Sequence, residues 1–116
     1  MIWNNKKNFV SPFLIKQILK ANCKYLVAGG ENCEEWHDET DIININLYPN
    51  FQVPESEDVM TTWHDNEPLK EVIWFALNNT NFDYYDFNKF LLIQIDAKFS
   101  NDEIKKIVDE EWYWKQ

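Results

Sequence analysis

Residues 59–80, VMTTWHDNEPLKEVIWFALNNT, decide the fold because they combine a strand, a polar corner and a helix. β-branched and aromatic side chains at 59–63 predict the strand. Pro68 stands in the first turn of the helix, where its missing N–H leaves no helical bond unmade. Asp65 or Glu67 is the expected N-terminal cap. The stretch therefore predicts one unit of an α/β layer.

The helix of this stretch is expected to be the most buried one in the chain. Its core stripe has helical spacing and consists of Leu69, Val72, Ile73 and Ala76. Further apolar residues widen the stripe until little of the helix can face water. Trp63, Trp74 and Phe75 are therefore interpreted as core residues. His64 is the one residue of the stretch that this interpretation leaves without a structural reason.

Two more strands are expected on either side of this unit. Residues 25–28, YLVA, and residues 90–95, FLLIQI, are short and almost continuously apolar. Such runs are typical of strands that are covered on both faces, as in a parallel sheet. The pair Gly29-Gly30 at the end of the first run indicates positive φ or a close approach of the backbone.

Three further helices alternate with these strands. Ser11 followed by Pro12 opens one helix, and Ser100-x-x-Glu103 is a capping box that opens the last. A third helix is expected over residues 31–41, capped by Asn32. Residues 42–47 fit either a continuation of this helix or a strand, because they are β-branched and partly alternate.

The order of these elements predicts one α/β domain over residues 1–116, with residues 1–10 as an N-terminal arm. We expect a small, mainly parallel sheet of three or four strands, flanked by about four helices. At this length the chain is too short for two domains.

The charge balance restricts the partners. Eleven basic residues face 20 acidic ones, so the net charge is −9. This charge disfavours nucleic acid and anionic membranes, because both are bound through Lys and Arg. It favours a basic protein partner, whose approach would be steered electrostatically.

The sequence favours the cytoplasm. Residues 1–10 lack the apolar core of an export signal, and no apolar run approaches the roughly 18 residues of a membrane span. Cys23 and Cys33 are therefore expected as reduced thiols. We expect no cofactor, and either a monomer or a weak homo-oligomer.

One candidate site lies at the carboxyl ends of the predicted strands, where ligands of open α/β sheets gather. Cys33 and His37 are four residues apart on one helical face, and His64 and Asp65 could complete a zinc site. Cys33 could instead form a thiolate pair with either histidine. The alternative to both is structural: a buried thiol and a hydrogen-bonded imidazole.

A second candidate site is a protein-binding surface. Aromatic and acidic residues alternate in Phe82, Asp83, Tyr84, Tyr85, Asp86 and Phe87. Aromatic residues dominate the centres of interfaces, and acids match a basic partner. Glu55, Glu57 and Asp58 are expected to extend this acidic surface.

The motifs at residues 33–38, CEEWHD, and 60–75, MTTWHDNEPLKEVIWF, resemble a family of small bacterial proteins known only as a domain of unknown function. That resemblance covers residues 25–77 and implies a shared fold and a bacterial origin, with no catalytic role. In size and charge the chain is also similar to immunity proteins that neutralise bacterial toxins.

Two functional hypotheses follow. The first is an acidic cytosolic binding protein, most concretely an immunity protein that occludes the active site of a basic toxin domain such as a nuclease. The alternative is a small metal-dependent or Cys/His enzyme with its site at the strand ends.

Overall fold

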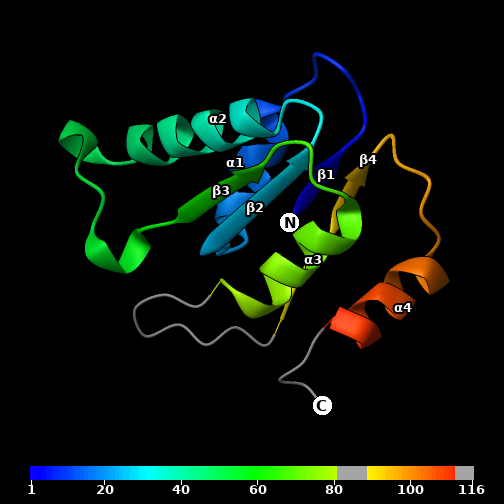
Figure 1. Cartoon of the computed structure of the whole chain (residues 1–116). Helices are drawn as coiled ribbons and strands as arrows, with labels where there is room; N and C mark the ends of the chain where they lie inside the picture. Colours follow the sequence, from blue (N-terminus) through cyan, green and yellow to red (C-terminus); the bar gives the residue numbers. More distant parts are fainter. Residues whose placement is uncertain (81–88, 112–116) are drawn as a thin grey trace.

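The computed structural model describes residues 1–80 and 89–111 (Figure 1). The strands in this part of the chain are β1 (Ile2–Asn4), β2 (Tyr25–Gly30), β3 (Met60–His64) and β4 (Ile93–Ile95). The α-helices are α1 (Pro12–Lys20), α2 (Cys33–Asn46), α3 (Leu69–Asn78) and α4 (Asn101–Glu111). Short 3₁₀ turns at Pro49–Phe51 and Glu55–Glu57 connect α2 to β3. The predicted α/β class is confirmed.

The sheet is parallel throughout, in the order β3-β2-β1-β4. Strand β1 therefore lies inside the sheet, and Ile2 is fully buried. The expected arm at 1–10 thus contains an interior strand. The sequence concealed it because only three residues pair, and polar Asn and Lys residues follow them at once. The strand expected over residues 90–95 forms only at Ile93–Ile95, and Leu91 is exposed.

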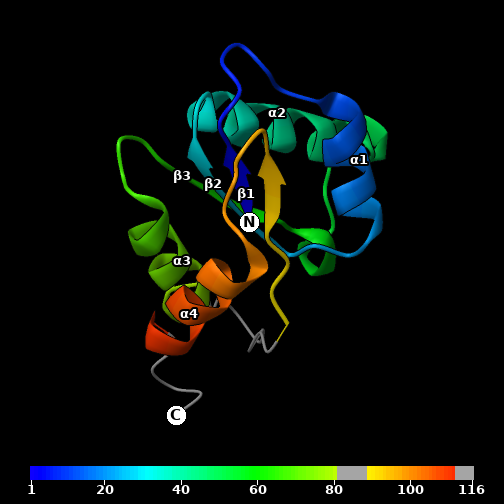
Figure 2. The same ribbon diagram turned by 90° about the vertical axis from the view of Figure 1, so that its right-hand side faces the viewer.

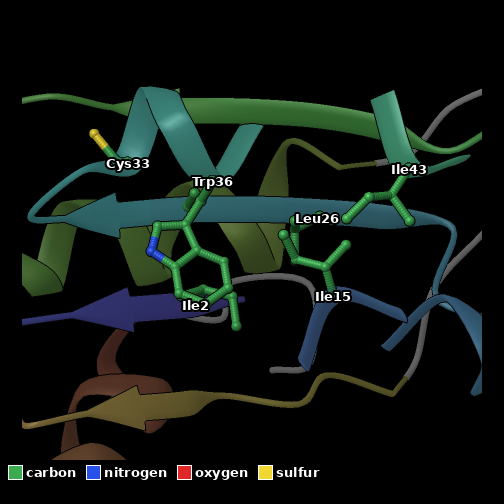
Figure 3. Close-up of a cluster of buried hydrophobic side chains, with 7 residues drawn as sticks. Ile2, Ile15, Leu26, Cys33, Trp36 and Ile43 are labelled. Carbon is green, nitrogen blue, oxygen red and sulfur yellow. The ribbon is translucent and has the colours of Figure 1, made fainter. Parts of the chain in front are cut away.

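Two helices cover each face of the sheet. Figure 2 shows α1 and α2 on one side and α3 and α4 on the other. Side chains of Ile2, Ile15, Leu26, Trp36 and Ile43 form the core beneath α1 and α2 (Figure 3). On the opposite face Val72 and Ala76 of α3 pack against Val27. The predicted stripe of α3 is confirmed, with Leu69, Val72, Ile73 and Ala76 all buried.

The ambiguous residues 42–47 mostly continue α2, which ends at Asn46. Helical spacing from Trp36 through Thr40 to Ile43 keeps one side of the helix on the core, and all three side chains are buried. The helix begins at Cys33 rather than at residue 31. Asn32 precedes it with a φ of 57°, and its side chain makes no capping bond.

The glycine pair has a packing role. A Cβ atom on Gly29 would lie 2.9 Å from the Trp3 ring. Gly30 has a φ of +81°, and a Cβ atom there would lie 2.1 Å from the carbonyl oxygen of Asn4. Both glycines therefore allow β1 to lie close to the end of β2.

Two of the expected helix starts are confirmed. The Ser11 hydroxyl accepts a hydrogen bond from the Leu14 amide at 3.1 Å. Ser100 and Glu103 exchange the bonds of a capping box at 3.1 and 3.4 Å. Neither Asp65 nor Glu67 caps α3, because Pro68 occupies the cap position without a side-chain bond.

Within the ranges described, no helix has the length and apolar character needed to cross a membrane.

Candidate protein-binding surface

His64 is a buried structural residue. It is 7% exposed, and its Nδ1 atom lies 2.8 Å from a carboxylate oxygen of Glu67. The Nε2 atom lies 3.1 Å from the Thr62 hydroxyl, and the ring packs 4.4 Å from the Phe75 ring. Both ring nitrogens therefore have partners within the fold. These contacts supply the structural reason that the sequence did not reveal.

Cys33 is also buried, at 3% exposure. Burial raises the pKa of its thiol above the ordinary value, and the negative charge of Asp65 raises it further. A thiol in such surroundings stays protonated at neutral pH, whereas nucleophilic cysteines have lowered pKa values. Cys33 therefore behaves as a small core residue at the start of α2.

His37 belongs to a different cluster, on the α2 side of β3. Its Nδ1 atom hydrogen-bonds the Thr61 hydroxyl, which also donates to Asp41 Oδ1 at 2.8 Å. Because the single hydroxyl proton goes to Asp41, Nδ1–H of His37 acts as the donor to Thr61. The imidazole also packs against the Trp63 ring, with centroids 4.5 Å apart.

The four proposed metal ligands are therefore divided. His37 meets β3 through Thr61 and Trp63, whereas His64 is directed toward Thr62 and Phe75. Successive side chains of a strand point to opposite faces, so the two histidines lie on opposite sides of β3. Across residues 1–80 and 89–111, no three His, Cys, Asp or Glu side chains are grouped to hold a metal ion.

Several apolar and acidic side chains of α2, of β3 and of the residues just before β3 are exposed. Trp63 is 44% exposed, so its interpretation as a core residue is wrong. Met60 and Ile45 are similarly exposed, at 42% and 41%. We call this area the α2–β3 surface and define it by Asp38, Asp41, Ile45, Asp58, Met60 and Trp63.

A hollow of about 470 Å³ lies within the α2–β3 surface. It is lined by the acidic residues Asp41 and Asp58 together with Ile45, Val53 and Met60. An exposed apolar patch with a charged rim is the usual composition of a protein-binding site.

The negative charge of the chain is concentrated in this half of the molecule. Residues 31–69 contain eleven carboxylates and no Lys or Arg. The rest of the chain has eleven lysines against nine acidic residues, and is slightly basic. The excess negative charge of the protein therefore belongs to α2, β3 and their connections. This signal was present in the sequence, but the total charge concealed it.

The expected acidic residues before β3 have different roles. Glu57 forms an ion pair with Lys24 at 3.2 Å, so part of its charge is compensated. Glu55 is exposed, and Asp58 lines the hollow of the α2–β3 surface. The other expected binding residues, Phe82, Asp83, Tyr84, Tyr85 and Asp86, lie outside the described residues.

A larger and mainly apolar hollow, of about 630 Å³, lies at the amino ends of the strands. It is lined by the beginnings of β2 and β4 and by the inner sides of α3 and α4. Thr80 and Lys89, which flank residues 81–88, are both on its wall. The polar residues at the carboxyl ends of the strands therefore do not line this hollow.

The chain is thus a small parallel α/β domain with exposed acidic and apolar residues on α2 and β3. Residues 1–111 match the model of the domain of unknown function DUF7684, and the chain belongs to that family. The match extends well beyond the residues 25–77 that carry the resemblance in sequence. Neither the curated proteins nor the solved structures contain a match to this chain.

Proposed function

We propose that this protein is a cytosolic binding protein for a basic protein partner, most concretely an immunity protein that occludes the active site of a basic toxin domain. The observation that carries the proposal is the segregation of charge. Residues 31–69, which include the exposed apolar side chains of α2 and β3, carry eleven carboxylates and no Lys or Arg. Charge of this kind accelerates association with a basic surface.

The mechanism is occlusion. Asp38, Asp41 and Asp58 would take the place of substrate phosphates against the Lys and Arg residues of a nuclease-like partner. Trp63 would supply the buried centre, because exposed aromatic side chains gain most from desolvation. The His37 ring beneath Trp63 holds the indole in place.

The test begins with a defined partner. The chain is used as bait, captured basic proteins are produced recombinantly, and each is tested for toxicity when expressed alone. We expect co-expression of the chain to restore growth. We also expect the association rate to fall by at least about tenfold between 50 and 500 mM salt. Unrestored growth, or an association rate that is independent of salt, would contradict the proposal.

A matched pair of variants separates a local effect from a general one. The triple change Asp38→Asn, Asp41→Asn and Asp58→Asn removes three charges from the α2–β3 surface. The control Glu71→Gln, Asp96→Asn and Asp102→Asn removes three charges elsewhere. We expect the first triple variant to weaken binding by at least about 2 kcal/mol and the control to weaken it by less than about 0.5 kcal/mol.

A further inference from the structure

We propose that the partner binds by adding an extended basic segment to the free edge of β3. This inference rests on the proposed function, and it specifies how that function is performed. Strand addition gives affinity through main-chain hydrogen bonds and specificity through alternate side chains. Three features of the molecule favour this mode: the direction of the β3 backbone groups, the covered opposite edge of the sheet and the local negative charge.

The backbone of β3 has a free edge. Met60 N–H donates to the Lys24 carbonyl at 3.0 Å, so Met60 is directed toward β2. In a parallel pair, alternate residues direct both N–H and C=O to the same neighbour. Thr62 and His64 therefore also face β2, whereas Thr61 and Trp63 face outward. No other backbone within residues 1–80 and 89–111 bonds these two residues.

The opposite edge of the sheet is less suitable. Strand β4 has only three paired residues, of which only Gln94 faces outward. The Gln94 side chain exchanges hydrogen bonds of 3.2 and 3.4 Å with the backbone of Phe99, which holds the following loop beside the strand. Short, covered edges resist the addition of a strand. Figure 2 shows β3 at the other margin of the sheet.

The side chains around β3 select a basic segment. Trp63 on the α2 side of β3 and Met60 on the opposite side offer apolar contacts to the alternating side chains of an added strand, and Asp38, Asp41 and Asp58 supply negative charge nearby. Pairing with a second copy of this chain through the same edge would bring the two acidic segments 31–69 together, and like charges repel. An extended segment with alternating Lys or Arg and apolar residues fits both requirements.

The experiment uses the full chain and a synthetic peptide of about eight residues that alternates Arg and Val. Residue-resolved amide hydrogen exchange is measured by NMR with and without the peptide. We expect the Thr61 and Trp63 amides to exchange at least about tenfold more slowly with peptide bound, while the Thr62 and His64 amides stay protected in both states. A peptide with the same sequence, but methylated at its backbone nitrogens, keeps its charges and should give no protection.

A pair of variants at one position tests the backbone contact in the protein itself. Thr61→Val and Thr61→Pro both lose the hydroxyl, but only proline loses the outward N–H. Proline is tolerated on an edge strand when its nitrogen faces solvent. We expect Thr61→Val to bind the peptide within about twofold of the wild type and Thr61→Pro to bind at least about tenfold more weakly. If Thr61→Pro does not fold, the amide hydrogen exchange of the wild-type protein decides whether the peptide pairs with β3.

The outcomes separate this inference from the proposed function. Equal binding of the plain and methylated peptides, or protection that excludes Thr61 and Trp63, would overturn strand addition. The same exchange measurement is then made with the captured partner. A toxic partner that the chain neutralises, but that leaves both amides unprotected, overturns strand addition alone. If no basic partner is neutralised, the proposed function fails, while the peptide result still decides whether the edge accepts a strand.

Discussion

At the scale of single residues, Gly30 is the least replaceable position described. Alanine there would place a Cβ atom 2.1 Å from the Asn4 carbonyl oxygen, at a φ of +81°. We expect Gly30→Ala to reduce the free energy of unfolding by about 3 kcal/mol, because both the positive φ and the backbone clash oppose it. Urea denaturation followed by tryptophan fluorescence measures this change.

Gly29 provides the control, because its obstacle is a side chain. Alanine at 29 meets the Trp3 ring at 2.9 Å. Replacing Trp3 by leucine should therefore recover part of the stability lost in Gly29→Ala. The same replacement should leave the loss in Gly30→Ala unchanged. Equal recovery at both positions would contradict the assignment of the Gly30 clash to backbone.

Two tryptophans separate folding from binding. Trp36 is fully buried, and its indole N–H donates to the Phe9 carbonyl at 3.1 Å. We expect Trp36→Ala to cost about 3–5 kcal/mol of stability. Trp63 is 44% exposed, so Trp63→Ala should cost less than about 1 kcal/mol. Trp63→Ala should nevertheless reduce the free energy of binding to the partner by about 2 kcal/mol, as measured by calorimetry.

Stability should depend on pH through Cys33. Burial, followed by the charge of Asp65, raises the pKa of its thiol in the folded state above the ordinary 9.0. The folded protein therefore holds this proton longer than the unfolded chain does. The resulting stability is fully present below the unfolded pKa and is lost as pH rises above about 9. Urea denaturation between pH 7 and pH 10 should show this decline, and the decline should be smaller in Cys33→Ala.

For this chain, the spacing of apolar residues predicted more of the structure than the identity of single residues did. The α3 stripe was found because burial imposes helical spacing on apolar residues. Trp63 was wrongly assigned to the core and the burial of His64 was not foreseen, because a strand buries alternate residues and the sequence does not reveal which set faces a neighbour. The contact of Phe75 with His64 and the exposure of β3 at the sheet margin determine the outcome.

At the scale of elements, the limits of α2 and β1 required tertiary structure. Residues 42–47 could form either element locally, and the contact of Ile43 with the core selects the helix. Strand β1 carries no periodic pattern over three residues, yet it pairs with both β2 and β4. The candidate surface likewise depends on α2 lying beside β3, which the motifs of the sequence do not encode.

Helix α4 should open independently of the rest of the domain. None of its described residues is fully buried, although Ile104, Ile107 and Val108 pack partly against α3. Removing the capping hydroxyl with Ser100→Ala should cost the helix about 1 kcal/mol. We expect faster amide exchange within α4 and little change in the slowest amides of β2. Ser11→Ala, at the cap of α1, is the comparison.

At the scale of the whole molecule, the uneven charge has a cost in stability. The eleven carboxylates of residues 31–69 repel one another in the folded state. We expect about 500 mM sodium chloride to raise the free energy of unfolding by about 1 kcal/mol, because salt screens this repulsion. The triple variant Asp38→Asn, Asp41→Asn and Asp58→Asn should gain less from salt. If salt raises the free energy of unfolding of the triple variant as much as that of the wild type, the repulsion arises from other residues.

The interior position of β1 determines when the fold can be completed. Ile2 pairs with Ala28 on one side and with Ile93 on the other, so β1 needs a strand that is translated about 90 residues later. On the ribosome, residues 2–64 can assemble three strands while the side of β1 that faces β4 remains unpaired. Closing a loop of this length is slow. The nascent chain therefore exposes one unpaired edge of β1 until residues 93–95 have left the ribosome, and this interval is when it most needs a chaperone.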